Sequence, residues 1–297
     1  RPRDQPLLSA PMLNSVDTKN PAAVAAFARQ VFHELFPGAS LVLLDRAFTD
    51  VETHYTGRHP GYLPLDLGYH DLEHVMQATV CLVHLLKGAH LSNEGHELTP
   101  RQYELAIVTA LLHDTGYLKI RTDVSGTGAK YTLTHVLRSC AFAASYLPTI
   151  GVQDQEVFAV LGAINCTGPA NEIGRLNFNT PADRFIGCAL ATADYLGQMA
   201  APDYPDKLGV LYNEFLESDN FMALPQARRV FKSADDLMQK TPDFWIKFVK
   251  PRLETQLDRA YRYLARPFPS GPNEYYEAVE RNIETVRQRL AAKAAAR

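Results

Sequence analysis

The chain has 297 residues, of which 46% are hydrophobic and 21% charged, which is enough apolar material for one large core or two modest ones. The formal net charge of −3 argues against a protein that coats nucleic acid, so we expect no nucleic-acid partner. No apolar run approaches the roughly 18 to 20 residues that span a bilayer, and we expect no membrane association.

The cysteines and the N-terminal segment indicate the cellular compartment of the protein. The cysteines are widely spaced, form no CxxC pair and have apolar neighbours, which predicts buried, reduced thiols: Cys81, Cys140, Cys166 and Cys188. Residues 1–20 are polar, contain prolines and lack an apolar segment of the signal-peptide type. We therefore predict a cytoplasmic protein whose residues 1–20 form an extended or disordered arm.

From residue 21 onward, helix-start signals recur along the chain. A capping side chain precedes a proline at the first helical position, where the missing N–H costs little, in Asn20-Pro21, Thr99-Pro100, Thr180-Pro181 and Thr241-Pro242. Apolar residues at three- and four-residue spacing follow each pair. The predicted helices, in chain order, are 22–36, 69–88, 100–113, 134–147, 154–165, 181–200, 207–218, 226–239, 242–265 and 273–294.

The segments between these helices carry no alternating strand pattern, so the predicted fold class is all-α. Leu41 to Leu44 form either a short strand or a helical turn, and residues 121–132 read as a polar, glycine-containing loop. The predicted organisation is one main helical domain over 21–265, with a motif core at 69–200, followed by a C-terminal helix and tail over 266–297.

Two short motifs bring histidines and a carboxylate to helix surfaces or ends. His70 and His74 are four residues apart, which predicts that both imidazoles project from one face of a single helix. His113 and Asp114 follow an apolar helix, and Gly116 is expected to end it. Neighbouring residues on a regular helix point about 100° apart, so His113 and Asp114 can share a metal only near such an end.

A distant aspartate completes the pattern. Asp194 lies inside the apolar run from 186 to 196, where a carboxylate is costly unless it is paired or bound to metal. Two or three imidazoles with two carboxylates suit Mn²⁺, Fe²⁺, Co²⁺, Ni²⁺ or Zn²⁺, whereas Mg²⁺ prefers more oxygen ligands. Each motif alone has a structural explanation; together and in this order they predict a metal site. The remaining histidines are expected on the surface or satisfied in the core: His33, His54, His59, His84, His90 and His96.

In this order the motifs resemble the HD-domain superfamily of metal-dependent phosphohydrolases over residues 69 to about 200. Tyr69-His70-x-x-x-His74 is also similar to the first signature of cyclic-nucleotide phosphodiesterases. The resemblance implies an HD-domain helical bundle with flanking helices. It also implies that His74, His113, Asp114 and Asp194 hold a first metal, that Asp114 bridges to a second, and that His70 is the catalytic acid.

The chain departs from those relatives at several positions. Asp71 follows His70 where the cyclic-nucleotide enzymes have asparagine, and Thr115 to Leu118 stand where they place a further histidine. Asn165-Cys166 occupies the approximate position of another histidine of two-metal bacterial proteins. His135 matches a second-metal histidine, although it is equally explained as a neighbour of a helix cap.

The implied reaction is hydrolysis of a phosphate ester by a metal-activated water, with one or two divalent ions (Mn, Fe, Ni, Co, Zn or Mg) per chain. His70 and Asp114 are the expected catalytic residues, and the substrate is a small-molecule phosphate ester or nucleotide, including a cyclic-nucleotide-type phosphodiester. The candidate substrate-binding residues, each of which also fits a solvated loop or the core, are Lys119, Arg121, Lys130, Tyr117 and Tyr195.

Two other functional classes stay open at this stage. A di-iron oxygenase built on the same scaffold would need six ligands, and a metal-bound signalling or binding module would need no turnover. A homodimer is also compatible with the sequence, because residues 242–294 mix Tyr, Phe and Arg that either cover the cleft or pack a dimer.

Overall fold

The computed structural model describes residues 11–296 and contains no strand in that range, only one isolated antiparallel bridge between Tyr62 and Ile120. The all-α prediction is therefore confirmed. The α-helices are α1 (Pro21–Leu35), α2 (Val42–Tyr55), α3 (Leu72–Leu91), α4 (Pro100–Leu112), α5 (His135–Tyr146), α6 (Asp154–Thr167), α7 (Pro181–Met199), α8 (Tyr204–Phe221), α9 (Ala234–Asp243), α10 (Lys250–Thr255) and α11 (Glu274–Ala295).

Three of the four predicted cap-proline pairs begin a helix. Asn20 accepts from Ala22 N and Ala23 N, and Thr99 and Thr180 each form a reciprocal capping box. The fourth prediction is wrong, because Thr241 and Pro242 lie inside α9. There the Thr241 hydroxyl donates to the carbonyl oxygen of Leu237 one turn earlier, so it does not cap a new helix.

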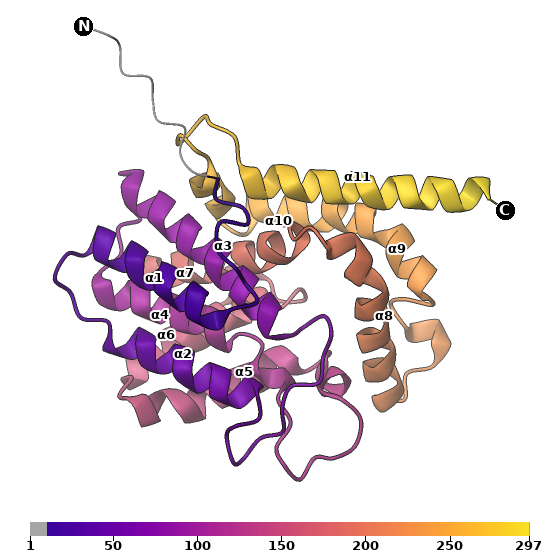
Figure 1. Ribbon diagram of the computed structural model, residues 1–297, viewed down its shortest axis with the longest axis horizontal. Helices are drawn as coiled ribbons and strands as arrows, with labels where there is room; N and C mark the ends of the chain where they lie inside the picture. The colour runs from indigo at the N-terminus through magenta and orange to yellow at the C-terminus, as the bar shows by residue number, and fades with distance from the viewer. Residues whose placement is uncertain (1–10, 297) are drawn as a thin grey trace, which may run out of the picture.

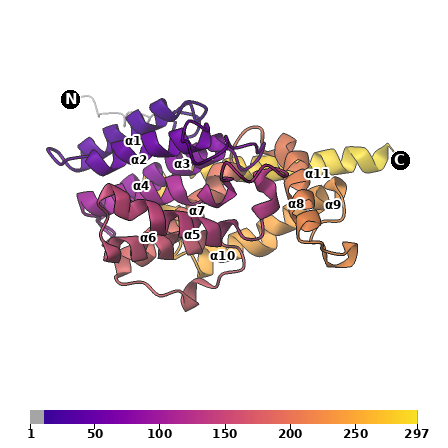
Figure 2. The same ribbon diagram turned by 90° about the horizontal axis from the view of Figure 1, so that it is seen from below.

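Helices α3 and α7 form the centre of the molecule and pack directly against each other. Helix α3 is buried on nearly every side between Val75 and Leu86, as expected for a helix that is apolar all round. Figure 2 shows α1 and α2 on one side of α4 and α7, with α5 and α6 on the other. Helices α8, α9 and α11 form a second group at the far end (Figure 1).

The chain after residue 200 differs most from the predicted elements. The predicted helix 226–239 begins only at Ala234, and the predicted helix 242–265 is broken into a π-helical turn Phe244–Val249, α10 and a 3-10 turn Ala260–Leu264. Pro242 and Pro251 each remove a backbone donor and crowd the preceding turn, which a widened turn accommodates. Asp258 and Arg259 have φ of 51° and 55°, so no helix continues through them.

Helix α2 is a finding of the structure, because the sequence left Leu41 to Leu44 open between strand and helical turn. The helix runs for 14 residues and buries one face that includes Leu44, Ala47 and Val51. It packs chiefly against α4, where the buried Glu104 accepts from Leu44 N at 3.1 Å. That long-range contact is invisible in the sequence of α2 itself.

The part of the predicted arm within the described residues is held against α11; residues 1–10 lie outside them. Met12 N and Leu13 N both donate to Glu274 Oε2, at 2.8 and 2.9 Å, and the Met12 side chain is buried. Helix α11 also packs on α7, α8 and α9. The first described residues therefore contact the first turn of the last helix.

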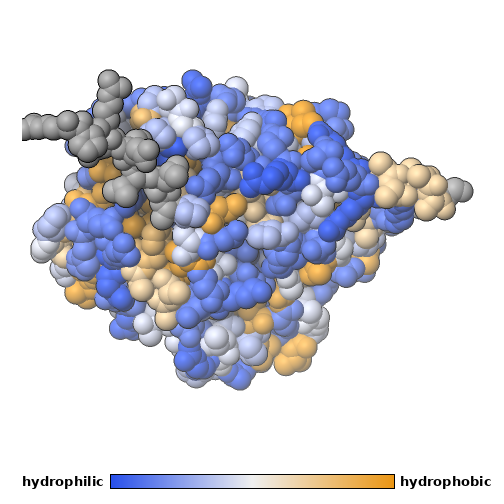
Figure 3. Space-filling view, turned by 45° about the horizontal axis from the view of Figure 1, so that its top comes forward, coloured by the Kyte–Doolittle hydropathy of each residue, from blue (hydrophilic) through white to orange (hydrophobic). Residues whose placement is uncertain are grey.

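The surface seen in Figure 3 is mostly hydrophilic, with small separate apolar patches. Among the described residues, none of the helices combines the length and the apolar composition that a membrane crossing requires. All four cysteines are buried and form no disulfide, as predicted.

Candidate metal centre and its cavity

His74 enters the site from the first turn of α3. Asp71 is the N-cap of that helix, and its carboxylate accepts from His74 N at 2.8 Å. Aspartate, like asparagine, is a favoured N-cap, which explains the chain's departure at this position. His70 therefore precedes the helix, and the prediction that His70 and His74 share one helical face is wrong. Their ring centroids nevertheless lie only 5.6 Å apart.

His113 and Asp114 lie at the end of α4, as predicted. His113 is the C-cap, and its Nδ1–H donates to the carbonyl oxygen of Ala110 at 2.6 Å, which leaves Nε2 free. Gly116 acts through close packing, because a Cβ there would lie 1.9 Å from the carbonyl oxygen of His135. The start of α5 therefore presses directly on the His-Asp turn.

Asp194 approaches the same point from the buried part of α7. The Asp194 Oδ1 atom is 3.2 Å from His74 Nε2 and 3.6 Å from His113 Nε2. The Asp114 Oδ2 atom is 3.2 Å from His74 Nε2 and 3.5 Å from His113 Nε2. Side chains from α3, the end of α4 and α7 thus converge, although they are far apart in sequence.

These residues fit a divalent cation. His74, His113 and Asp114 each offer a ligand atom within 4.8 Å of the others. Ligands about 2.1 Å from a shared ion stand about 3 Å apart at right angles, close to the spacings observed here. The buried His113 Nε2 and Asp114 Oδ2 have no hydrogen-bond partner among the described residues. Such atoms are costly in a protein interior unless something else binds them.

The electrostatics point the same way. Burial opposes protonation of His74, but the Asp114 and Asp194 carboxylates outweigh it and raise the pKa of His74 to about 10. Burial also opposes ionisation of Asp114 and Asp194, yet the neighbouring histidines hold the pKa of both carboxyl groups below the usual value. The two carboxylates therefore draw positive charge to this point, whether protons or a metal ion carry it.

The rings of His135, Tyr117 and His70 form a cluster beside these residues. The Tyr117 ring centroid lies 4.7 Å from that of each histidine, and the two histidine centroids are 6.2 Å apart. The His135 Nδ1–H donates to Thr132 O at 2.6 Å, and its Nε2 lies 3.7 Å from Asp114 Oδ1. Burial lowers the pKa of His135, more than Asp114 raises it. A neutral imidazole beside Asp114 is what a second-metal ligand requires.

Two residues that the sequence analysis missed hold the predicted ones in place. Glu214 of α8 accepts from Tyr69 N at 2.7 Å and lies 2.6 Å from His70 Nδ1. Gln198 donates to Asp194 Oδ1 at 3.1 Å and accepts from the Tyr69 hydroxyl at 2.7 Å. Gln198 stands one helical turn after Asp194, a signal the sequence offered; Glu214 is 144 residues from His70 and offered none.

A cavity of about 430 Å³ opens beside the cluster. Of the predicted site residues, those that line it are His70, Tyr117, His135, Asp194 and Tyr195. The hydroxyls of Tyr117 and Tyr195 are buried and have no hydrogen-bond partner among the described residues. The cavity therefore places both predicted tyrosines where a ligand could contact them.

The three predicted substrate-binding cations do not line this cavity. Lys119 pairs with Asp66 at 2.8 Å, Lys130 pairs with Asp123, and Arg121 donates to backbone carbonyls between residues 57 and 62. Burial of the two lysines requires such partners. We therefore assign all three to bracing the loop, as a correction to their predicted role.

Asn165, which stands where two-metal bacterial proteins have another histidine, is engaged away from the candidate metal site. Its Nδ2 donates to Leu161 O at 2.9 Å and contacts Cys140 Sγ at 3.5 Å. A second ion would consequently depend on Asp114 and His135 for protein ligands. The six protein ligands expected of a di-iron oxygenase are not brought together among residues 11–296.

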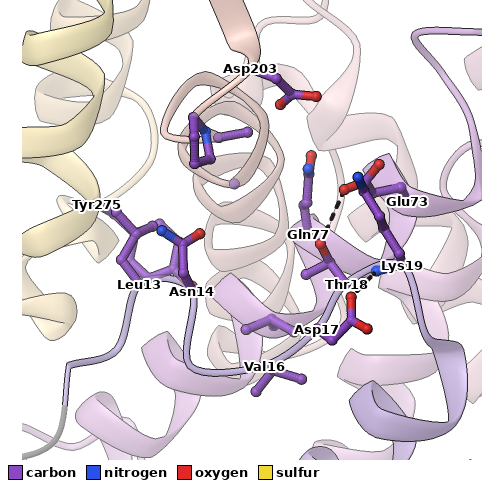
Figure 4. Close-up of a pocket in the computed structure, with 14 residues that line it drawn as sticks. Leu13, Asn14, Val16, Asp17, Thr18, Lys19, Glu73, Gln77, Asp203 and Tyr275 are labelled. Atoms are coloured by element: carbon purple, nitrogen blue, oxygen red, sulfur yellow. Dashed lines mark hydrogen bonds between the residues drawn. The ribbon is translucent and has the colours of Figure 1, made fainter.

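A second cavity, of about 440 Å³, lies away from the predicted site residues (Figure 4). It is lined by residues 13, 14 and 16–19 together with Glu73, Gln77, Asp203 and Tyr275, and Thr18 donates to Glu73 there. Its carboxylates belong to a surface network in which Lys207 lies 3.7 Å from Glu73 and 3.4 Å from Asp203.

Comparisons with known proteins agree with this fold. The solved structure of LmjPDEB1 in complex with IBMX superposes with a TM-score of 0.51 at 15% identity, covering 96% of each chain. At that identity the similarity shows the fold alone. No curated protein matches the chain. A family model described as Npun_R2479-like matches residues 64–266, more than half of the chain and every predicted metal ligand. The chain therefore belongs to the Npun_R2479-like family.

Proposed function

We propose that this protein is a metal-dependent phosphohydrolase of the HD-domain type. The observation that carries the proposal is the convergence of His74, His113, Asp114 and Asp194 beside His70 and a cavity. The fold shared with the phosphodiesterase LmjPDEB1 supports it. A phosphate ester is the substrate class, and a nucleotide, including a cyclic-nucleotide-type phosphodiester, is the first to test.

His74, His113, Asp114 and Asp194 would hold a first ion, and His135 with Asp114 would hold a second. A divalent ion at this position acidifies water and offsets charge on phosphoryl oxygens. Gln198 fixes the orientation of the Asp194 carboxylate through its 3.1 Å hydrogen bond. Such outer contacts keep a ligand aligned when the ion is bound.

His70 is the proton donor to the departing oxygen. The His70 Nδ1–H donates to Glu214, which leaves His70 Nε2 available for a ligand in the cavity that His70 lines. The stack with Tyr117 keeps the imidazole plane fixed. The buried Tyr195 hydroxyl donates to a substrate oxygen, which would satisfy an otherwise unpartnered group.

The test is a hydrolysis panel on metal-stripped protein that is re-supplied with Mn²⁺, Mg²⁺, Ni²⁺ or Fe²⁺. The substrates are bis-p-nitrophenyl phosphate, cyclic AMP, cyclic GMP and nucleoside monophosphates. We expect turnover only when metal is present. His113→Ala and Asp114→Ala should lose bound metal and activity together, while His33→Ala, on the exposed face of α1, should keep both.

Metal-independent turnover, or stoichiometric metal in both ligand variants, would contradict the proposal. Oxygen uptake by protein with two bound irons would instead support an oxygenase. Stable metal binding without hydrolysis of any ester would support a binding module.

A further inference from the structure

The wall of the cavity formed by α8, α9 and the segments after them is apolar. It consists of Leu211, Phe215, Phe231, Leu237 and Phe244. The same cavity is also lined by polar side chains of the candidate site, which include His70, His135 and Asp194. The cavity thus combines reactive groups with an apolar wall.

The apolar wall is a packed surface rather than a set of scattered side chains. Phe215 and Phe231 meet edge to face with ring centroids 5.0 Å apart. Leu237 is buried, whereas Phe244 at the start of the π-helical turn is 40% exposed. The neighbouring Trp245 is fully buried and donates to Glu280, which anchors the turn. The wall is therefore held in place before any ligand arrives.

Charged and amide groups around the cavity are already engaged. Among the described residues lining it, Lys240 is the single lysine or arginine, and it donates to Val230 O and Asp236 Oδ2. The Asn171 amide donates to Asn165 O, and Gln198 bridges Asp194 and Tyr69. Among the described residues, the cavity lining thus offers no arginine fork for a second phosphate charge, and its one lysine and its glutamine are already paired.

We propose that the preferred substrate is a phosphodiester with a large apolar substituent. The substituent packs on the wall around Phe215, Phe231 and Leu237, while the phosphorus faces the His-Asp cluster. A diester carries a single negative charge, which suits a cavity with so few cations. The inference rests on the proposed function and narrows its substrate class.

The test uses p-nitrophenyl alkyl phosphates with methyl, ethyl, butyl and hexyl groups, all on metal-loaded protein. The leaving group is constant, so only the contact with the wall changes. Burial of one methylene is worth about 0.8 kcal/mol, and we expect kcat/KM to rise about fourfold per methylene. A profile that is flat across the series would overturn the inference while leaving the proposed function intact.

Matched variants test whether the wall residues contact the alkyl substituent. Phe231→Ala and Phe215→Ala should lower kcat/KM for the hexyl ester at least tenfold and leave the methyl ester within about twofold. Phe158→Ala removes an exposed phenylalanine of α6 outside the cavity and should change neither value. Equal losses for both esters in the wall variants would contradict a role in contacting the substituent.

A binding measurement separates this inference from chemistry. Calorimetry with ethylphosphonate and hexylphosphonate, whose P–C bonds are not hydrolysed, should give the tighter Kd for hexyl, and Phe231→Ala should remove the difference. Hexyl preference in binding without hydrolysis of any ester would uphold the wall and overturn the proposed function. Equal Kd values for the two phosphonates would overturn the wall.

Discussion

At the scale of single residues, Glu214 is the contact on which the role of His70 depends. One carboxylate serves two donors: Oε1 accepts from Tyr69 N, and Oε2 faces His70 Nδ1. A carboxylate can satisfy both because it offers two acceptor oxygens, whereas a glutamine offers one. The geometry therefore predicts that replacing Glu214 by glutamine, which has nearly the same volume, disturbs the orientation of the His70 imidazole.

We expect His70→Ala to lower kcat on the order of 10² to 10⁴-fold with metal content unchanged, as for a lost acid-base group. Glu214→Gln should lower kcat less, by roughly 10-fold or more, because His70 loses its fixed orientation. Steady-state kinetics with elemental analysis measures both.

The matched control for Glu214→Gln is Glu217→Gln. Glu217 lies on the same helix and accepts from Thr127 N and its hydroxyl, at the loop rather than at the site. Normal turnover in His70→Ala, or equal loss in the two glutamine variants, would contradict the role given to His70.

Gln198 gives a second prediction at this scale. Gln198→Leu removes the donor to Asp194 but keeps the side-chain volume approximately, so we expect metal affinity to fall about 10 to 100-fold. Competition against a chelating dye measures the Kd. Gln288→Leu on exposed α11 serves as the control, and unchanged affinity in Gln198→Leu would exclude the orienting role.

At the scale of elements, the contact between the His-Asp turn and α5 positions His113 and Asp114, two of the proposed metal ligands. Gly116 N donates to Ser139 Oγ at 2.8 Å, and Arg138 donates to Gly116 O at 2.7 Å. A side chain at residue 116 would force α5 away from this turn. The glycine therefore permits a close approach and does not supply a left-handed helix end.

We expect Gly116→Ala to lower the free energy of unfolding by about 1 to 3 kcal/mol and to weaken metal binding, because the added Cβ overlaps the His135 carbonyl. Gly209→Ala in α8, where a Cβ has no neighbour within 4 Å, should instead raise stability by up to about 1 kcal/mol. Urea unfolding of both variants distinguishes steric overlap from a general effect of removing glycine.

The sequence predicted those elements whose signals are local. Caps at Asn20, Thr99 and Thr180 mark true helix starts, because the capping side chain bonds within its own first turn. The same signal is misleading at Thr241, because this residue lies inside α9 and its hydroxyl donates to the carbonyl oxygen of Leu237. Helix α2 escaped prediction because its stability comes from packing on α4.

The candidate site could likewise be predicted only where the signal is local in the sequence. The ligand residue types were readable, and the structure brings His74, His113, Asp114 and Asp194 together. Roles that depend on long-range partners were not readable. Lys119 pairs with Asp66, and His70 contacts Glu214 on α8, and no spacing in the sequence predicts either contact.

At the scale of the whole molecule, His84 links global stability to pH. The side chain is buried in α3, with its ring 4.8 Å from that of Phe27. Burial, with Arg266 and Lys87 nearby, lowers the pKa of His84 to about 4 from its ordinary 6.5. Between about pH 6.5 and pH 4, His84 is therefore protonated in the unfolded chain but neutral in the folded protein.

We accordingly expect stability to fall as the pH drops from about 6.5 to about 4, by at most about 3 kcal/mol from this residue. His84→Leu should be less stable or equal at pH 7.5 and show a flatter decline. Urea unfolding at pH 7.5, 6 and 5 measures the difference. Parallel pH profiles for the two proteins would show that His84 is not the group responsible.

The hydrogen bonds from Met12 and Leu13 to Glu274 join the beginning of the described chain to its last helix, and Leu13 lies beside Tyr275 (Figure 4). The segment around Met12 and the first turn of α11 each lose a partner when the other detaches, so the two form one cooperative unit. The amide protons of Met12 and Leu13 should then exchange with solvent at the rate at which α11 opens. Removing residues 11–13 and replacing Glu274 by alanine would consequently disrupt the same contact, and the two losses of stability would be less than additive.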